Sequence, residues 1–444
     1  MFSKNLNKEK PAYGGIEESI PNSLLPKETE TLVVGGGLLG LSAALSLAEA
    51  GHDVTLVEMN KIGDGPSGRS GGHLWPGYEM FLSEMKEKFG RDLTLKAWKL
   101  TDDALSEVHR RLNKREDKCD FTPGLMVTSK TESQAEWLEK EALDFKDFGL
   151  DFASYVEGED LKKNYINTDQ YLNGIFFLGE EGRQYGHLNP LKYAQTTAIL
   201  AHEAGAKLIE ETVVEKISQM KDARYLIKTS QGEVIAKNIV LATGADFFRP
   251  KGIDYSIVSR DNISTQTVIL ATEPISEKLA LEMIPGKVCF ADCDDRDMNY
   301  VALIADSERS DYYRLTFGGA DALMQAETIS EIPKIEKEMR RMFPQLDREN
   351  IKVEKIWGGN CDMSSTLLPS ILNPHPGIFH ADGFSGQGMI NTTLYGTAIA
   401  EKILGKDTGK FEILEKLNPP PYSKNFLIAW LQVVRAVFFG STKV

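Results

Sequence analysis

The chain has few cysteines and no pattern that would join them. Only Cys119, Cys289, Cys293 and Cys361 occur in 444 residues, and no two of them show C-x-x-C spacing. A disulfide framework or a zinc site would need denser or regularly spaced ligands. We therefore expect neither disulfides nor a metal site, and we expect a cytoplasmic protein.

Long apolar runs are also missing. No run reaches the roughly 18 apolar residues that a membrane-spanning helix needs, and the charged N-terminal residues do not resemble a signal peptide. The most apolar stretch, residues 426–439, is interrupted only by Gln432 and Arg435. Packing on the protein body is the favoured interpretation, while a peripheral membrane contact and an oligomer contact stay open.

Basic residues are outnumbered. There are 51 Lys and Arg against 65 Asp and Glu, so the formal net charge is −14. Such a protein repels phosphate backbones, and no basic run offsets the repulsion. We therefore expect no nucleic acid partner, whereas the same charge mildly favours a cationic substrate.

A strand–helix–strand unit lies near the N-terminus. Residues 31–35 form an apolar strand, residues 38–50 suit a helix packed on a sheet, and residues 54–58 form the next strand. The first turn reads Gly35-Gly36-Gly37-Leu38-Leu39-Gly40, which is a G-x-G-x-x-G motif. In this strand-to-helix context the motif predicts a dinucleotide site, and a glycine-rich turn without a ligand is the alternative.

Each residue of this unit has a separate task in binding a dinucleotide. Gly35 permits the tight turn, Gly37 lets the backbone approach the pyrophosphate, and Gly40 lets the helix lie close to the strand. The start of the helix offers N–H groups to the phosphates. Glu58 follows Gly37 by 21 residues, and its carboxylate can accept hydrogen bonds from ribose hydroxyls.

A second strand and turn, far along the chain, favours FAD over NAD. The segment Val240-Leu-Ala-Thr-Gly244 ends an apolar strand in a small residue and a glycine. In FAD-binding folds such a distant strand returns beside the first turn, and a strand that simply ends in a turn is the alternative.

A loop after the second strand carries a resemblance to a known family. The segment Lys61-Ile-Gly-Asp-Gly-Pro-Ser-Gly-Arg-Ser-Gly-Gly72 resembles the D-amino-acid-oxidase-like flavoenzymes, in particular the gamma-glutamylputrescine oxidase type, whose pattern is I-G-x-G-x-S-G-R-x-G-G. Further matches follow in the same order: Asn189-Pro190, Ala271-Thr-Glu-Pro274, Phe317-Gly-Gly319, Phe343-Pro344, Trp357-Gly-Gly359, Gly383-Phe-Ser-Gly-Gln-Gly388, and Pro419-Pro420-Pro421 before an apolar segment.

The resemblance implies an α/β fold, α+β overall. A GR2-type, Rossmann-like FAD-binding domain would carry an inserted substrate domain with an antiparallel sheet. The boundaries that we expect are 1–30 for an N-terminal arm; 31–80, 186–265 and 351–412 for the FAD-binding domain; 81–185 and 266–350 for the substrate domain; and 413–444 for a C-terminal apolar segment.

The resemblance also implies where FAD would be held. Residues 67–74 would wrap the isoalloxazine edge and the pyrophosphate, Val214 would pair with adenine, and residues 386–389 would meet the pyrimidine end of the flavin. A glycine-rich turn before a helix independently suits that end, because a helix N-terminus stabilises the negative charge of reduced flavin. The expected FAD contacts are Gly35, Gly37, Leu38, Leu39, Gly40, Glu58, Met59, Ser67, Arg69, Ser70, Gly72, His73, Leu74, Val214, Thr243, Gly244, Gly383, Ser385, Gly386, Gln387, Gly388 and Met389.

Departures from the family pattern bear on the substrate. Basic residues that anchor a substrate carboxylate in sarcosine oxidase relatives are replaced by Pro76 and Ile390, which disfavours a small α-amino acid unless another residue such as Arg314 substitutes. An arginine of the putrescine-derivative branch is replaced by Ala302. A cysteine-linked flavin would need a thiol near Gly359, so we expect non-covalent FAD and a free, buried Cys361.

Amine oxidation by a flavin needs a neutral, well-positioned amine and little else from the protein. Aromatic walls can desolvate the amine and favour its neutral form. The candidates are His73, Trp75, Tyr78, Tyr300, Trp357 and Phe384, and ordinary packing is the alternative for each. Our catalytic candidates are His73, Tyr300 and Trp357; His73 is a base, a flavin contact or a structural histidine.

The function that we expect is oxidative deamination of a primary or secondary amine by FAD. A polyamine derivative such as gamma-glutamylputrescine is the favoured substrate, and oxygen would reoxidise the flavin to give hydrogen peroxide. Two alternatives stay open: a dehydrogenase that passes electrons to a quinone or carrier, and a flavoprotein that modifies a partner protein.

Overall fold

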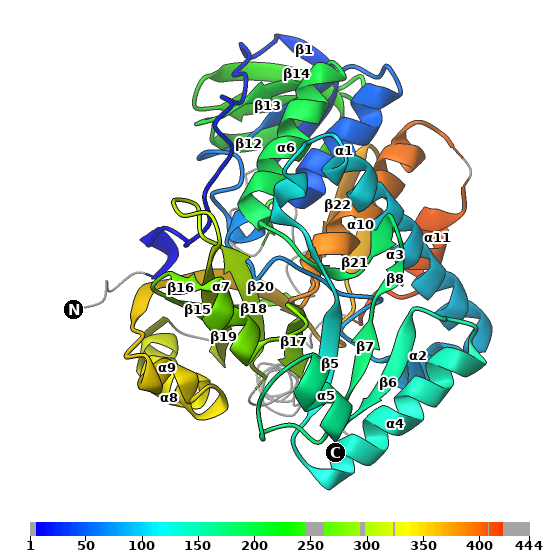
Figure 1. Cartoon of the computed structure of the whole chain (residues 1–444). Helices are drawn as coiled ribbons and strands as arrows, with labels where there is room; N and C mark the ends of the chain where they lie inside the picture. Colours follow the sequence, from blue (N-terminus) through cyan, green and yellow to red (C-terminus); the bar gives the residue numbers. More distant parts are fainter. Residues whose placement is uncertain (1–5, 245–261, 294–297, 323–324, 407, 421–444) are drawn as a thin grey trace.

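A computed structural model describes residues 6–244, 262–293, 298–322, 325–406 and 408–420. Figure 1 shows two sheets with helices packed against them. The apolar stretch at 426–439, on which the membrane interpretation depends, lies outside the described residues. No described helix is both long and apolar enough to cross a membrane.

The first sheet has a parallel core. Its strands run in the order β11 (Lys207–Ile209), β2 (Val54–Val57), β1 (Glu28–Val34) and β14 (Gly232–Leu241), and β22 (Ile378–Asp382) pairs with the end of β14. All these pairs are parallel. Because a parallel sheet is covered on both faces, its strands read as continuous apolar runs.

Three helices cover one face of this sheet. They are α1 (Leu38–Glu49), which is close to the predicted range 38–50, α6 (Pro190–Glu203) and α10 (Gly388–Ile403). Val33 of β1 packs in the core under the helices, whereas Leu32 packs in the core of the opposite face, as alternating side chains require. The antiparallel strands β12 (Val214–Gln219) and β13 (Tyr225–Thr229) extend the sheet beyond β14.

The second sheet has nine strands and is almost wholly antiparallel. Its order is β20 (Val353–Ser364), β15 (Asn262–Thr272), β19 (Tyr312–Ala322), β18 (Tyr300–Ala305), β17 (Cys289–Asp292), β5 (Leu125–Ser129), β7 (Asn173–Phe177) and β6 (Ala153–Glu157), and β16 (Ile275–Ser276) pairs with β19. The exception is β17, which pairs in parallel with β5.

The expected domain boundary at residue 351 separates two strands that the structure pairs in one sheet. β20 falls in the range assigned to the FAD-binding domain, yet it pairs with β15 along nearly its whole length. Gly358 and Gly359 interrupt the side-chain alternation of β20, so the sequence did not reveal its partner. Similarly, α3 (Arg91–Leu112), assigned to the substrate domain, packs on α10 and α6.

Short elements connect the two sheets. The three-stranded sheet of β3 (His73–Leu74), β10 (Gly186–His187) and β4 (Thr122–Pro123) holds His73 in place. The remaining elements are η1 (Leu6–Lys8), η2 (Pro66–Gly68), η3 (Lys118–Asp120), β8 (Gly179–Glu180), β9 (Arg183–Gln184), β21 (Ser370–His375), α2 (Leu82–Phe89), α4 (Glu132–Asp147), α5 (Gly158–Asn164), α7 (Glu277–Met283), α8 (Gln325–Met342), α9 (Gln345–Arg348) and α11 (Lys410–Glu415).

Candidate functional site

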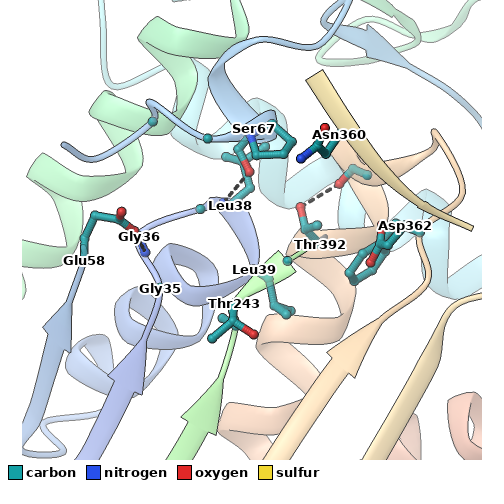
Figure 2. A pocket seen from close by; sticks show the side chains of 18 of the residues that line it. Gly35, Gly36, Leu38, Leu39, Glu58, Ser67, Thr243, Asn360, Asp362 and Thr392 are labelled. Carbon is teal, nitrogen blue, oxygen red and sulfur yellow. Dashed lines mark hydrogen bonds between the residues drawn. The ribbon is translucent and has the colours of Figure 1, made fainter. Parts of the chain in front are cut away.

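A first cavity opens at the carboxyl ends of β1, β2 and β14. Turns from opposite ends of the chain meet there, since Gly35 to Leu39 line the same cavity as Gly386, Gly388 and Met389. Figure 2 shows Glu58 and Gly36 on one side of this cavity and Asn360, Asp362 and Thr392 on the other. Ligands of open parallel sheets bind at such carboxyl ends.

The glycines of the first turn are required by close backbone approaches. Gly35 has φ +114°, and a Cβ there would lie 2.2 Å from the carbonyl oxygen of Ala242. A Cβ on Gly40 would lie 2.0 Å from the carbonyl oxygen of Gly35. The helix α1 can therefore start directly above the strand, with its N-terminus toward the cavity.

Glu58 lies at the end of β2, as expected for a ribose ligand. Its carboxylate accepts hydrogen bonds from the N–H of Gly36 at 2.6 Å and the N–H of Asn60 at 2.9 Å. Burial raises the pKa of Glu58, and these two donors oppose the shift. The glycine cradle, the helix N-terminus and this carboxylate together fit the phosphates and ribose of a dinucleotide.

Most of the expected FAD contacts line the first cavity. These are Gly35, Gly37, Leu38, Leu39, Glu58, Met59, Ser67, Ser70, Val214, Thr243, Gly244, Gly386, Gly388 and Met389. In the described structure Gly40, Leu74 and Gly383 lie behind the cavity walls: Gly40 approaches the Gly35 carbonyl, Leu74 pairs with Gly186 of β10, and the Gly383 N–H donates to Oδ2 of Asp362.

A second cavity adjoins the first. The two share Pro66, Ser70, Asn360, Cys361, Gly386 and Met389. Of the expected cofactor or catalytic residues, the second cavity is lined by Arg69, Ser70, Gly72, His73, Tyr300, Ser385, Gly386, Gln387 and Met389. Its walls come from the second sheet, where β5, β15 and β18 contribute Val127, Thr267 and Tyr300, and from the loop after β2 and the start of α10.

His73 is a buried, neutral wall of the second cavity. Its ring lies edge-on to Tyr300, with 5.9 Å between centroids, and 6.5 Å from the ring of His187. Burial, with a smaller effect of His187, lowers the pKa of His73 to about 3. A group this weakly basic cannot take the proton of an ammonium, so the geometry favours a neutral hydrogen-bonding or contact role over that of a base.

Acidification is expected to destabilise the protein through these histidines. Burial lowers the pKa of His187 to about 4 and that of His73 to about 3, whereas both protonate near 6.5 in an unfolded chain. The free energy of unfolding therefore falls as the pH drops below 6.5, by about 2 kcal/mol per histidine near pH 5. Between pH 7 and pH 5 the free energy of unfolding, measured with urea, should fall by about 2 kcal/mol less in a His187→Gln variant than in the unaltered protein.

The matched control for this measurement is His202→Gln on α6, which leaves the buried pair intact. The control variant should show the pH dependence of the unaltered protein. Equal pH dependence in the His187→Gln variant would show that His187 is already charged in the folded state.

Tyr300 and Trp357, the other catalytic candidates, are placed differently. The Tyr300 hydroxyl lies 3.1 Å from the hydroxyl of Thr267, and its ring lines the second cavity. Trp357 is fully buried and, among the described residues, lines neither cavity; its indole N–H donates to the carbonyl of Arg69 at 2.9 Å. Trp357 therefore supports the Arg69 loop, because its position on β20 points it into the core against Tyr13.

The guanidinium groups of Arg69 and Arg314, the arginines considered for the substrate site, both donate hydrogen bonds to other protein groups. Arg69 is the one Lys or Arg among the described residues that line the second cavity, and its guanidinium donates to the carbonyls of Gly358, Leu6 and Glu9 at 2.6–2.9 Å. Arg314 donates to Asp306, Glu354 and the carbonyl of Thr272, away from the cavity. Arg314 therefore does not replace the basic residues that the sequence lacks at Pro76 and Ile390, which are both buried.

Several lining residues were not singled out from the sequence. Asn360 follows Trp357-Gly-Gly359 directly and Asp362 lies two residues further on, while Thr392 lies one turn into α10. Their closeness in sequence to the recognised motifs was therefore the available signal. Cys361 is half-buried and lines both cavities, so the expectation of a buried thiol is wrong. The residue is partly exposed because β20 ends where the two cavities meet.

No metal centre accompanies these cavities in the described part of the chain. The described residues hold no group of three or more His, Cys, Asp or Glu side chains arranged to bind a metal ion.

Comparisons of sequence agree with this geometry. The family model described as FAD dependent oxidoreductase matches residues 30–402. The chain is 31% identical to a probable oxidoreductase OrdL of Haemophilus influenzae over 396 residues, covering 89% of this chain and 87% of that one. It is 27% identical to gamma-glutamylputrescine oxidoreductase of Escherichia coli over 425 residues, covering 95% and 92%.

Solved structures show the same fold at lower sequence identity. Glycine oxidase from Geobacillus kaustophilus matches with a TM-score of 0.68 at 18% identity, covering 86% of this chain and 96% of that one. L-proline dehydrogenase from P. horikoshii matches with a TM-score of 0.67 at 18% identity, covering 87% and 96%. The glycine cradle, the distant turn that meets it and the family match over most of the chain lead to one conclusion: this protein belongs to the D-amino-acid-oxidase (DAO) family of FAD-dependent oxidoreductases.

Proposed function

We propose that the protein oxidises a primary or secondary amine whose reacting nitrogen lies far from any carboxylate, with a polyamine derivative such as gamma-glutamylputrescine as the favoured substrate. The observation that carries this proposal is the second cavity. Its one described Lys or Arg side chain, Arg69, is bound to three main-chain carbonyls. The relative named gamma-glutamylputrescine oxidoreductase supports the same class of substrate.

The walls of the second cavity suit a neutral amine. Trp75, Phe81 and Tyr300 supply aromatic surface, and His73 is neutral above about pH 4 because burial lowers its pKa to about 3. A desolvated amine has a lowered pKa and releases its proton more readily. Bound FAD supplies the hydride acceptor. The walls exclude water and orient the amine, and no side chain among those described needs to act as a strong base.

The start of α10 supplies a further electrostatic contribution. Gly388 and Met389 line the cavities, and the first turn of α10 carries no acidic side chain. A helix N-terminus stabilises nearby negative charge, so it favours the acceptance of electrons by a flavin held there. We propose that the cofactor is held without a covalent bond, because Gly359 carries no thiol.

Anaerobic bleaching of the bound flavin tests the proposed substrate class. The panel is gamma-glutamylputrescine, putrescine, D-alanine and sarcosine, each at the same concentration. Because a buried carboxylate without a partner costs about 1–3 kcal/mol, amines without a nearby carboxylate should bleach about ten- to hundredfold faster. Bleaching by D-alanine and sarcosine alone would contradict the proposal.

The electron acceptor is tested on the same reduced protein. We propose oxygen, with hydrogen peroxide as the product, and we expect reoxidation by air to keep pace with turnover. A dehydrogenase would be reoxidised slowly by air and quickly by a dye or quinone. The aromatic cavity walls do not favour a partner protein as the substrate.

A further inference from the structure

Three titratable side chains gather behind the first cavity. Asp362 belongs to the end of β20, and His380 and Asp382 belong to β22. His380 and Asp382 are 4% and 7% exposed, while Asp362 is half-buried and lines the cofactor cavity. Figure 2 labels Asp362 and Thr392 of α10 among the residues that line this cavity. This cluster has no part in the function proposed above.

His380 is held by acceptors on both sides of its ring. Nδ1 lies 2.8 Å from the carbonyl oxygen of Leu241, and Nε2 lies 2.6 Å from Oδ2 of Asp382. A carbonyl only accepts, so Nδ1 carries a proton. A second proton must then lie between Nε2 and Asp382, either on the ring or on the carboxyl. Burial disfavours the charged ring, but Asp382 and the Leu241 carbonyl outweigh it and raise the pKa of His380.

Asp362 links this pair to the cavity. Its Oδ2 accepts the N–H of Gly383 at 2.6 Å, and its carbonyl accepts the N–H of Ser385 at 3.0 Å. The titratable groups that face Asp362 are Asp382 and His380 from β22, with Cys361 beside it on β20. The first turn of α10 adds no acidic side chain. Burial, followed by repulsion from Asp382, raises the pKa of Asp362 to about 7.

We propose that Asp362 takes up one proton from solvent when the cofactor in the first cavity is reduced. Reduction of bound FAD would take two electrons from the reductant and one proton, which comes with the hydride of an amine or from solvent when the reductant supplies electrons alone. A second proton would pass from solvent to the Asp362 carboxylate, which becomes a carboxylic acid. Added negative charge in the cavity favours this protonated form. Asp382 repels the Asp362 carboxylate and His380 attracts it, so the Asp362 carboxyl can be either protonated or ionised near neutral pH. The inference rests on FAD binding alone and not on the substrate.

The reduction potential of the bound flavin measures this coupling. The holoenzyme is reduced with dithionite against reference dyes between pH 6 and pH 9. Uptake of two protons per two electrons changes the reduction equilibrium about hundredfold per pH unit, or about 59 mV, whereas uptake of one proton changes it about tenfold, or about 30 mV. In the unaltered enzyme we expect a pH range in which the reduction equilibrium changes about hundredfold per pH unit. In Asp362→Asn we expect about tenfold per pH unit at every pH between 6 and 9.

The amide of Asp362→Asn would keep an oxygen that accepts the Gly383 N–H, so this variant should retain flavin. His375→Gln on β21 is the control and should match the unaltered enzyme. A tenfold dependence throughout in the unaltered enzyme, or a hundredfold region that persists in Asp362→Asn, overturns the proposal. If Asp362→Asn loses flavin, the variant Asp382→Asn is measured instead. Removing the repulsion from Asp382 lowers the pKa of Asp362, so the pH range with the hundredfold change should move to lower pH. If that range does not move, the proposal is overturned. Because dithionite replaces the substrate, failure of the amine panel leaves this test intact.

Discussion

Replacing Gly40 with alanine is expected to give a folded protein that is purified with little or no bound flavin. The new Cβ would lie 2.0 Å from the carbonyl oxygen of Gly35, a separation that real Cβ atoms do not adopt. Since the obstacle is backbone, α1 must move away from β1, and its N-terminus moves away from the cofactor phosphates. Overpacking of this kind costs about 1–3 kcal/mol, so the dissociation constant for FAD should rise about ten- to hundredfold.

The measurement is a titration of the apoprotein with FAD, followed by flavin fluorescence. Gly51→Asn at the other end of α1 is the matched control, because Gly51 has φ +74° and no atom within 4 Å of an added Cβ. Asparagine tolerates this conformation, so the control should bind FAD as the unaltered protein does. A full flavin complement in Gly40→Ala would show that the turn does not carry the phosphates.

Replacing Gly318 with alanine is expected to slow substrate oxidation at least tenfold while flavin stays bound. A Cβ on Gly318 would lie 2.0 Å from the Cε2 and Cζ atoms of Tyr300. The ring must shift, and with it the wall of the second cavity and the contact with Thr267. A displacement of about 1 Å at a reacting substrate can cost about 100-fold in rate.

The neighbouring residue gives a matched control. On Gly319 the nearest atom to an added Cβ is the Asn299 side-chain oxygen at 3.4 Å, an ordinary contact. Gly319 also lines the second cavity, but an added methyl group displaces none of its neighbours, so Gly319→Ala should keep its rate of anaerobic flavin reduction within a fewfold of the unaltered enzyme. Equal rates in Gly318→Ala and Gly319→Ala would mean that Tyr300 does not shape the substrate site.

Most features of the expected cofactor site could be located from short sequence patterns. The first turn and Glu58 could be located from sequence because a strand, a glycine turn and a helix are short-range features, and their geometry follows from neighbouring residues. The turn at Gly386 to Met389 was reached through a family resemblance and the same helix argument. Both turns line the first cavity.

The substrate side was less accessible from sequence. Trp357 stands in a recognisable motif, but the sequence does not show that its ring is buried in the core. Nor does the sequence show that the nearby Cys361 and Asp362 line a cavity. The pairing of β20 with β15 was missed because the glycines of β20 hide the alternation that identifies a strand. Which side of a strand meets a cavity depends on its partners, and those partners are distant in the chain.

The sequence by itself therefore determined the place of the first glycine turn, which follows from local periodicity and from the glycines that close backbone contacts demand. It also determined the fold class, which its resemblance to a known family implied. Only the tertiary structure decided which side chains meet around the second cavity. Arg69 is held by carbonyls of Leu6 and Glu9, and Asp362 stands near His380 and Asp382. These contacts join segments far apart in the chain, and their burial, which sets charge and reactivity, exists only after the two sheets have packed.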